Sequence, residues 1–338
     1  MRGLRIIALS LAGLLATAAT PVAAPRYHVA GRIAGPDGAG WDYARVDPAT
    51  RRLYVAHGAA VTVVDLAHGN AVRSIGTIER GHAVVPIPGT NTLLVTSGHD
   101  NSVRLLDMRD GHQLASLAVG GNPDAAIWDP ATRRALVMNA QGGSVSVIDV
   151  ATARVERTIP VKPGLEYAAI GPEGMLFVND EDANEMEVVD IRSGKVGTPI
   201  ALAGCEGPTG LAYDGRTGRL LSACANGKLA VVDARGRRLV GLIDIGRGPD
   251  AVILDEARRL AFVPCGRDGV LDVLALDGPA GVRRIASIAT EPGARTGALD
   301  PTDGAIYLPT AALGPPATPG GRPVAKPGTF HLLVLRPA

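Results

Sequence analysis

Aromatic residues and cysteines are scarce in this chain of 338 residues. It contains two Trp, six Tyr and three Phe, which together make 3% of the sequence, and three Cys. Aliphatic residues must therefore build the core, and the hydrophobic content of 46% is ample for a folded protein. Three cysteines are too few for a disulfide-rich scaffold, and no C-x-x-C-H motif for attaching a haem occurs.

Basic runs and nucleotide-binding motifs are also missing. The 34 Lys and Arg residues nearly balance the 33 Asp and Glu residues, and no Lys/Arg-rich run occurs, so nucleic acid is not the expected partner. The Gly pairs at 120–121 and 142–143 lie between expected strands with no helix after them, so no nucleotide-binding P-loop is expected. The sequence is instead rich in Gly (43 residues) and Pro (25 residues), which predicts many turns.

Residues 1–24 have the pattern of a secretory signal peptide. Arg2 and Arg5 precede an apolar run over 6–19, and small residues follow it. An uncleaved anchor is the alternative, but the run is shorter than the ~20 residues that a bilayer requires. No later stretch is long enough to span a membrane. We expect cleavage and export of the mature chain to the periplasm or the medium.

A hydrophobic strand, in most copies ending in Asp, recurs about every 42 residues. Its copies end at Asp65, Asp107, Asp149, Asp190, Asp233, Ala275 and Val334. The turn sequence Asp-Pro-Ala-Thr-Arg-Arg keeps the same period at 47–52 and 129–134. Each repeat holds four short apolar or alternating segments separated by turn residues, and none has helical periodicity. Seven such repeats predict an all-β fold, a single seven-bladed β-propeller over residues 25–338.

The two ends of the chain resemble parts of one blade. Residues 330–335 read as the third strand of the last repeat, and no fourth strand follows. Residues 27–33 read as a fourth strand without predecessors. We expect the N-terminal strand to complete the last blade, which leaves neither part with an unpaired edge.

These features resemble the YVTN-repeat, or YncE-like, family of exported β-propellers. The namesake strand is seen as Tyr-Val-Ala-His at 54–57 and as Leu-Val-Thr-Ser at 94–97, and Gly-Trp-Asp-Tyr at 40–43 is also family-like. The resemblance covers essentially the whole mature chain and implies the fold. It does not select a function, because more loosely related propellers include metal-dependent lactonases, a lyase and pure binding scaffolds.

Loops that enter the first strands should share one face with the ends of the second strands, and ligands usually bind to this face of a propeller. Five residues before each turn, the seven repeats have Asp42, His82, Asp124, Glu166, Thr209, Asp250 and Arg295. All of these side chains except that of Thr209 are ionisable. Carboxylates crowded at a channel mouth repel one another unless a cation, a proton or Arg295 compensates.

We therefore predict a divalent-cation site whose ligands are Asp42, His82, Asp124, Glu166 and Asp250. Oxygen ligands with one imidazole suit Ca²⁺, which we prefer, or Mn²⁺ or Zn²⁺. The predicted ligand-binding residues are Arg295, Thr209, and three residues at second-strand ends, His57, Asn139 and Asn179. The alternative is a hydrated polar vestibule without a metal, in which Asp124 and Asp250 only cap turns.

Cys205 lies in the loop that enters the blade whose second strand ends at Cys224, so these residues should meet on one face. Cys224 and Cys265 hold equivalent positions in adjacent blades, roughly 10 Å apart and beyond the ~7 Å limit for a disulfide. We expect a Cys205–Cys224 disulfide and a free Cys265. Three reduced, buried cysteines are the alternative.

Two function classes stay open. The first is a monomeric exported propeller that binds a small molecule or a protein partner at the channel mouth. The second is a metal-dependent hydrolase of the lactonase type, in which the cation polarises a carbonyl and a carboxylate or His82 acts as base. The mixed ring of acids, His and Arg favours the enzyme, whereas the lack of a recognisable nucleophile–base pair argues against it.

Overall fold

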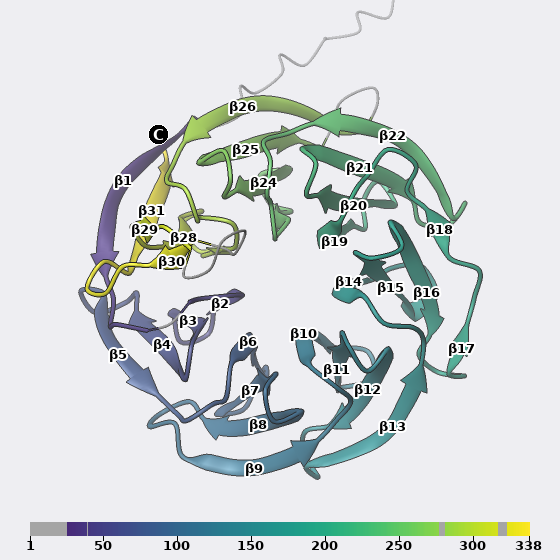
Figure 1. The fold of residues 1–338 in the computed structure, drawn as a ribbon, viewed down its shortest axis with the longest axis horizontal. Coiled ribbons are helices and arrows are strands. Elements are labelled where there is room, and N and C mark those ends of the chain that lie inside the picture. The colour runs from purple at the N-terminus through teal and green to yellow at the C-terminus, as the bar shows by residue number, and fades with distance from the viewer. Residues whose placement is uncertain (1–25, 39, 277–280, 317–322) are drawn as a thin grey trace, which may run out of the picture.

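Seven antiparallel sheets surround a central axis in the computed structural model (Figure 1). The structure describes residues 26–38, 40–276, 281–316 and 323–338. The sheets are the seven blades that the sequence repeat predicts, so the fold is a seven-bladed β-propeller. The predicted signal peptide, residues 1–24, lies outside the described residues.

In each blade the strands run outward from the axis in chain order, apart from the last blade. The innermost strands are β2 (Ala44–Asp47), β6 (Gly81–Pro86), β10 (Pro123–Asp129), β14 (Leu165–Ile170), β19 (Pro208–Asp214), β23 (Ile253–Asp255) and β27 (Ala298–Leu299). The second strands are β3 (Arg52–His57), β7 (Thr92–Ser97), β11 (Arg134–Asn139), β15 (Met175–Asp180), β20 (Arg219–Cys224), β24 (Leu260–Cys265) and β28 (Ile306–Thr310).

The third and fourth strands form the outer half of each blade. The third strands are β4 (Ala60–Asp65), β8 (Ser102–Asp107), β12 (Ser144–Asp149), β16 (Glu185–Asp190), β21 (Lys228–Asp233), β25 (Val270–Ala275) and β31 (His331–Pro337). The fourth strands are β5 (Ala71–Ile75), β9 (Gln113–Ala118), β13 (Arg154–Pro160), the split pair β17 (Lys195–Val196) and β18 (Ile200–Ala201), β22 (Arg238–Asp244), β26 (Arg283–Ala289) and β1 (Tyr27–Ala34). A hairpin, β29 (Leu313–Gly314) with β30 (Val324–Ala325), and a 3-10 turn, η1 (Pro172–Gly174), complete the elements.

The strands differ in burial as their sequences predict. Second and third strands such as β3 and β4 are buried at nearly every position, because both of their faces pack against neighbouring blades. The fourth strands alternate, as in β22, where exposed and half-buried positions follow one another along the strand. The core is therefore a set of aliphatic layers between blades, which explains why so few aromatic residues suffice.

The recurring Asp residues build the turns far from the candidate site. Asp129 accepts hydrogen bonds from the Ala131 amide at 3.0 Å and the Thr132 hydroxyl at 2.5 Å. Asp65, at the end of a third strand, likewise accepts from the Ala67 amide at 3.2 Å. These bonds are Asx-type turns. The regular Asp positions therefore serve the fold, as the repeat predicts.

The last blade combines the first and the last strand of the described chain. Its strand order is β1-β31-β28-β27, and β1 pairs antiparallel with β31 from Tyr27 opposite Pro337 to Ala34 opposite His331. The Tyr27 ring packs edge-on against Phe262 of the sixth blade, with centroids 4.8 Å apart. The predicted closure by the N-terminal strand is confirmed. In the part of the chain that the structure covers, no helix is long and apolar enough to cross a membrane.

Deleting β1 should destabilise the protein severely. The deletion opens one edge of β31 and removes the buried side chains of Tyr27 and Ile33, each worth about 2–5 kcal/mol. We expect a lower melting temperature and aggregation, measured by thermal unfolding and size-exclusion chromatography. His28→Ala, at an exposed position of the same strand, is the control and should change little. A truncated protein that stays monomeric with an unchanged melting temperature would contradict closure as a stabilising device.

Candidate functional site

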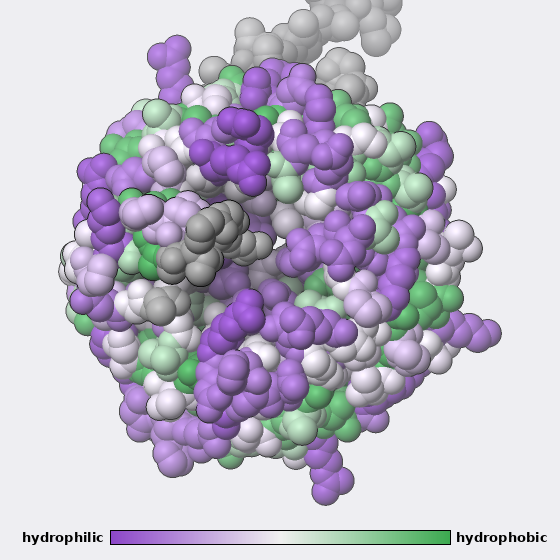
Figure 2. Space-filling view, viewed as in Figure 1, coloured by the Kyte–Doolittle hydropathy of each residue, from purple (hydrophilic) through white to green (hydrophobic). Residues whose placement is uncertain are grey.

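The seven aligned residues lie at one end of the propeller axis, at or just before the innermost strands. We call this end, bounded by Asp42, His82, Asp124, Glu166, Thr209, Asp250 and Arg295, the mouth. The register confirms that second strands end beside it, since Pro123 pairs with Asn139 and Pro208 with Cys224. Figure 2 shows the centre of the ring hollowed and rimmed largely by hydrophilic side chains.

A circle of hydrogen bonds between adjacent blades holds the mouth residues in place. The carbonyl of His82 accepts from the Tyr43 amide at 3.0 Å, and that of Asp124 accepts from the Thr96 hydroxyl at 2.8 Å. The remaining five junctions are bridged by Gly164 N to Ala140 O, Asn179 Nδ2 to Thr209 O, Thr209 Oγ1 to Pro249 O, Asp250 N to Arg295 O, and Thr296 Oγ1 to Asp42 O. The backbone at or close to each mouth residue is thus tied to a neighbouring blade.

Asp42, His82 and Asp124 converge in three successive blades. His82 Nδ1 lies 2.7 Å from Asp42 Oδ2 and 3.7 Å from Asp124 Oδ2. One ligand atom from each of the three residues lies within 4.8 Å of the others. All three side chains are at most 15% exposed, yet they still reach solvent. These residues form the part of the predicted cation site that the structure brings together.

Burial and the neighbouring charges shift the pKa values of two members of this group. Burial raises the pKa of Asp124 to about 7, with help from Asp42 and Asp250 and against the opposing effect of His82. Burial alone would lower the pKa of His82, but its hydrogen bond to Asp42 and the charge of Asp124 raise it, against the smaller opposing effect of Arg80. The imidazolium therefore acts as the cation between two carboxylates.

Asp250 and Arg295 form a separate pair at the mouth. Arg295 Nε donates to Asp250 Oδ2 at 2.7 Å, and Nη2 donates to the Trp41 carbonyl at 3.1 Å. Burial would lower the pKa of Arg295, but the charges of Asp250 and Asp42 raise it, so the guanidinium stays charged. Asp250 is thus compensated by Arg295, and we leave it out of the cation site proposed below.

Glu166 is held from across the axis by a tyrosine. The Tyr43 hydroxyl, from the first blade, donates to Glu166 Oε2 in the fourth blade at 3.3 Å. Burial and the charges of Asp124 and Asp250 raise the pKa of Glu166 well above its usual range. Arg45 donates in the same way to the Tyr167 hydroxyl, and the two tyrosine rings pack with centroids 4.8 Å apart. These contacts bridge the axis between the first and fourth blades.

The sequence interpretation missed Tyr43 and Tyr167, although a signal was present. Both tyrosines directly follow a mouth acid. At the equivalent positions the other five blades have small residues, namely Ala83, Ala125, Gly210, Ala251 and Thr296. A Cβ at Gly210 would lie 2.5 Å from the Ala251 backbone, so there the blades are in direct contact. Two large residues among five small ones indicate side chains that cross the axis.

The predicted ligand-binding residues at second-strand ends lie inside the blades. His57 is 4% exposed, stacks on Phe330 with ring centroids 3.9 Å apart, and lies 3.0 Å from the Thr62 hydroxyl through Nδ1. Asn139 and Asn179 are fully buried and hydrogen-bond to Ser144 and to the Thr209 carbonyl. Second strands are one layer farther from the axis than first strands, so their ends are covered by the loops that enter the blades. We do not include these three residues in the proposed site.

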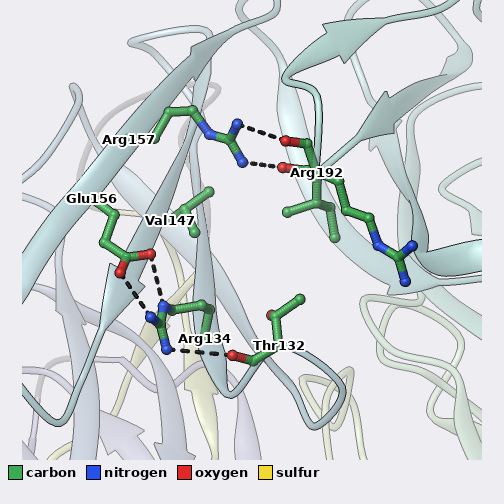
Figure 3. A pocket seen from close by; sticks show the side chains of 7 residues that line it. Thr132, Arg134, Val147, Glu156, Arg157 and Arg192 are labelled. Carbon is green, nitrogen blue, oxygen red and sulfur yellow. Dashed lines mark hydrogen bonds and ion pairs between the residues drawn. The ribbon is translucent and has the colours of Figure 1, made fainter.

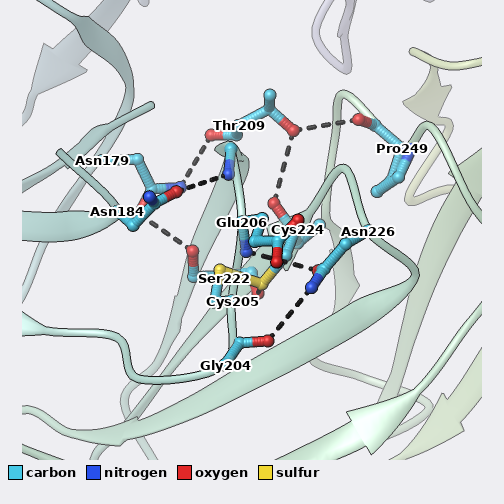
Figure 4. The surroundings of a disulfide bond; sticks show 12 residues. Asn179, Asn184, Gly204, Cys205, Glu206, Thr209, Ser222, Cys224, Asn226 and Pro249 are labelled. Carbon is cyan, nitrogen blue, oxygen red and sulfur yellow. Dashed lines mark hydrogen bonds between the residues drawn. A yellow bond between two sulfur atoms is a disulfide. The ribbon is translucent and has the colours of Figure 1, made fainter. Parts of the chain in front are cut away.

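Thr209 has a similar structural role. Its hydroxyl donates to the Pro249 carbonyl at 2.9 Å, and its own carbonyl accepts from Asn179 (Figure 4). The side chain is therefore engaged between the fifth and sixth blades. Of the residues predicted to bind a ligand, Arg295 is the one that remains available at the mouth.

A second acidic group lies beside the mouth in the fourth blade. Asp180, Glu185 and Glu187 gather around Lys162, whose Nζ is 3.0 Å from Glu187 Oε1 and also bonds Glu185. The lysine ammonium occupies the centre of this cluster and balances part of its charge. The cluster is therefore a salt-bridge network that joins the third and fourth blades.

A cavity of about 210 Å³ lies at the other end of the blades, between the third and fourth (Figure 3). It is lined by Thr132, Arg134, Val147, Glu156, Arg157, Ile191 and Arg192. Arg134 is paired with Glu156 at 2.7 Å, and Arg157 donates to the carbonyls of Ile191 and Arg192. The Arg134–Glu156 pair lies within the third blade, whereas the Arg157 bonds join it to the fourth. The cavity is smaller than the ~300 Å³ at which ligand pockets begin.

The cysteine prediction is confirmed. Cys205 and Cys224 form a disulfide with Cα atoms 5.4 Å apart, and Cys265 is free and buried (Figure 4). The disulfide fixes the loop that enters the fifth blade, where Asn226 also accepts from the Glu206 amide and donates to the Gly204 carbonyl. Burial raises the pKa of the Cys265 thiol far above its usual range, which makes it unreactive.

Comparisons with known proteins support the fold. No family model matches the chain, and no curated protein matches it. A chain in a structure of Kuenenia stuttgartiensis hydrazine synthase superposes with a TM-score of 0.70 at 16% identity, covering 82% of this chain and 92% of that one. A chain in a structure of a mitotic checkpoint complex gives 0.75 at 15% identity and covers 98% of both. At such identities the likeness shows the propeller fold alone.

Removing the disulfide should lower stability without unfolding the ring. The bond joins residues 19 apart, and opening a loop of this size costs about 3 kcal/mol. We expect that loss for Cys205→Ala/Cys224→Ala in urea unfolding. Cys265→Ala, which removes a buried thiol but opens no loop, is the control. Peptide mapping of protein exported to the periplasm should find one alkylatable thiol. Three such thiols would refute the bond.

Proposed function

We propose that this chain is an exported propeller of the YVTN-repeat, or YncE-like, type that binds its ligand at the mouth through a divalent cation. The cation would be held by Asp42, His82 and Asp124. The observation that carries the proposal is the convergence of their ligand atoms within 4.8 Å at a solvent-accessible end of the axis. The repeat phrases and the fold support the family, and the N-terminal pattern supports export.

The spacing of the three donors fits a metal after a small adjustment. Donor atoms around a tetrahedral Zn²⁺ stand about 3.3 Å apart, given metal–ligand bonds of ~2.0 Å. The 3.7 Å between His82 Nδ1 and Asp124 Oδ2 is close to this value. The 2.7 Å between His82 Nδ1 and Asp42 Oδ2 is shorter because these two atoms form a hydrogen bond. Replacing the proton with a cation would lengthen this contact by about half an ångström.

The donor set favours Zn²⁺ or Mn²⁺ over Ca²⁺, the ion that the sequence favoured. Ca²⁺ prefers six to eight oxygen ligands. Glu166 and Asp250 are engaged by Tyr43 and Arg295, so two of the predicted oxygen donors are not available without breaking these contacts. One imidazole with two carboxylates suits Zn²⁺ or Mn²⁺ and leaves positions open for an external ligand.

The occupant of those positions is a small molecule in this proposal, bound by a monomeric propeller. Tyr43 and Tyr167 pack against each other across the axis, and the proposed ligand enters from the mouth side. A protein partner is the alternative occupant.

Binding of Mn²⁺ or Zn²⁺ by isothermal titration calorimetry tests the cation site. We expect one site per chain and a loss of at least about tenfold in affinity for His82→Gln or Asp124→Asn. His99→Gln, at an exposed mouth-side loop, is the matched control and should bind normally. Melting temperatures of all variants exclude unfolding as the cause.

Acidification should weaken this binding. The cation must displace the protons of His82 and Asp124, whose pKa values are both raised, so affinity falls as the pH falls through these values. Each proton released contributes up to about tenfold per pH unit. An affinity equal at pH 8 and pH 6, or unchanged in both variants, would contradict the site.

A hydrolase of the lactonase type is the second candidate, and Glu166 favours it. Its raised pKa keeps this carboxyl protonated beside the proposed cation, which suits a general acid. In a screen of lactones and esters, hydrolysis should then require the metal, stop with a chelator, and fall at least about a hundredfold in Glu166→Gln. Glu206→Gln is the control at an exposed loop. Metal binding without any turnover would contradict the hydrolase and leave binding as the remaining function.

A further inference from the structure

Within the described chain, two of the three guanidinium nitrogens of Arg295 are held by hydrogen bonds, and the third, Nη1, is not. Nε is bound to Asp250 at 2.7 Å and Nη2 to the Trp41 carbonyl at 3.1 Å, in two different blades. Nη1 makes no hydrogen bond within the part of the chain that the structure describes. Two bonds to a planar fork fix its orientation, so Nη1 is a preset donor.

This donor is accessible and close to the cation site. The Arg295 side chain is 35% exposed, more than any of the three proposed metal ligands. Nη2 bonds to the residue before Asp42, and the Thr296 hydroxyl donates to the Asp42 carbonyl at 2.9 Å. The guanidinium therefore contacts the residue that directly precedes Asp42, one of the proposed ligands of the cation.

The charges of the mouth determine the order of binding. Without a cation, an anion entering the mouth meets the carboxylates of Asp42, Asp124 and Asp250, whose charge His82 and Arg295 offset in part. A divalent cation at the Asp42 group reverses the local sign and offers open coordination positions. An anionic oxygen ligand is thus accepted after the cation and excluded before it.

We propose that the ligand is a carboxylate that bridges the bound cation and Nη1 of Arg295. The inference rests on the proposed cation site and adds the class of ligand to it. One carboxylate oxygen would coordinate the cation, and the other would accept a single charge-assisted hydrogen bond from Nη1. By linkage, the carboxylate must also tighten cation binding by the same factor.

The test uses the full-length mature protein, Mn²⁺, and succinate as the probe, followed by calorimetry. We expect succinate to bind only in the presence of Mn²⁺, and succinamide, its neutral analogue, not to bind. The double variant Asp250→Asn/Arg295→Gln removes the pair without changing net charge. It should weaken succinate binding at least about tenfold and change the Mn²⁺ affinity less than about twofold.

A matched control exists at another mouth-side loop. Arg247 and Asp268 form an exposed pair of the same kind at 2.8 Å, so Arg247→Gln/Asp268→Asn repeats the charge exchange away from the cation group. It should leave succinate binding unchanged. Thermal unfolding of both double variants shows whether each stays folded, and Arg295→Lys tests for the fork, because a lysine keeps the charge but not the geometry.

The outcomes separate the two proposals. No Mn²⁺ binding by the parent protein would overturn the cation site and this inference with it. Mn²⁺ binding with no succinate binding, with equal succinate binding in the Arg295 double variant, or with a preference for inorganic phosphate would overturn the carboxylate assignment alone. Binding of succinate without Mn²⁺ would overturn the order of binding and hence the bridge.

Discussion

Every contact at the mouth depends on the circle of hydrogen bonds that joins each blade to the next. Five of its acceptors are the carbonyls of mouth residues themselves, so the bond that holds two blades together also sets the height of a functional side chain. Buried backbone carbonyls must be paired, and here the pairing comes from the neighbouring blade. The site is therefore built by ring closure and would not exist in a part of the propeller.

Within this frame the acids at the mouth are compensated in three different ways. Asp42 and Asp124 share His82, Asp250 has Arg295, and Glu166 has the hydroxyl of Tyr43 together with its own proton. Burying a carboxylate is costly unless it is paired or neutralised. Compensation is least complete in the first group, because the one positive charge of His82 faces two carboxylates. A bound cation would therefore be stabilised most strongly by the group of Asp42, His82 and Asp124.

The bridge across the axis follows from a break in the sevenfold pattern. A propeller with one residue type at all seven positions would leave an open channel or a crowded one. Here five small residues make room for Tyr43 and Tyr167, which meet across the axis between the first and fourth blades. The two rings and the bond from the Tyr43 hydroxyl to Glu166 thus bridge the axis beside the mouth acids. Asymmetry within the repeat, rather than the repeat itself, creates a binding site.

The sequence by itself determined the blade count, the closure by residues 27–33, the mouth positions and the Cys205–Cys224 pair. Each of these follows from position within a 42-residue period, because equivalent positions in a propeller have equivalent places in space. The pairings among Asp42, His82, Asp124, Asp250 and Arg295 did not follow. They depend on side-chain direction across blade junctions, which no period encodes. For the same reason His57, Asn139 and Asn179 looked like site residues in the alignment of repeats. Only the tertiary structure decided that the entering loops bury them, and that two tyrosines from opposite blades meet across the axis.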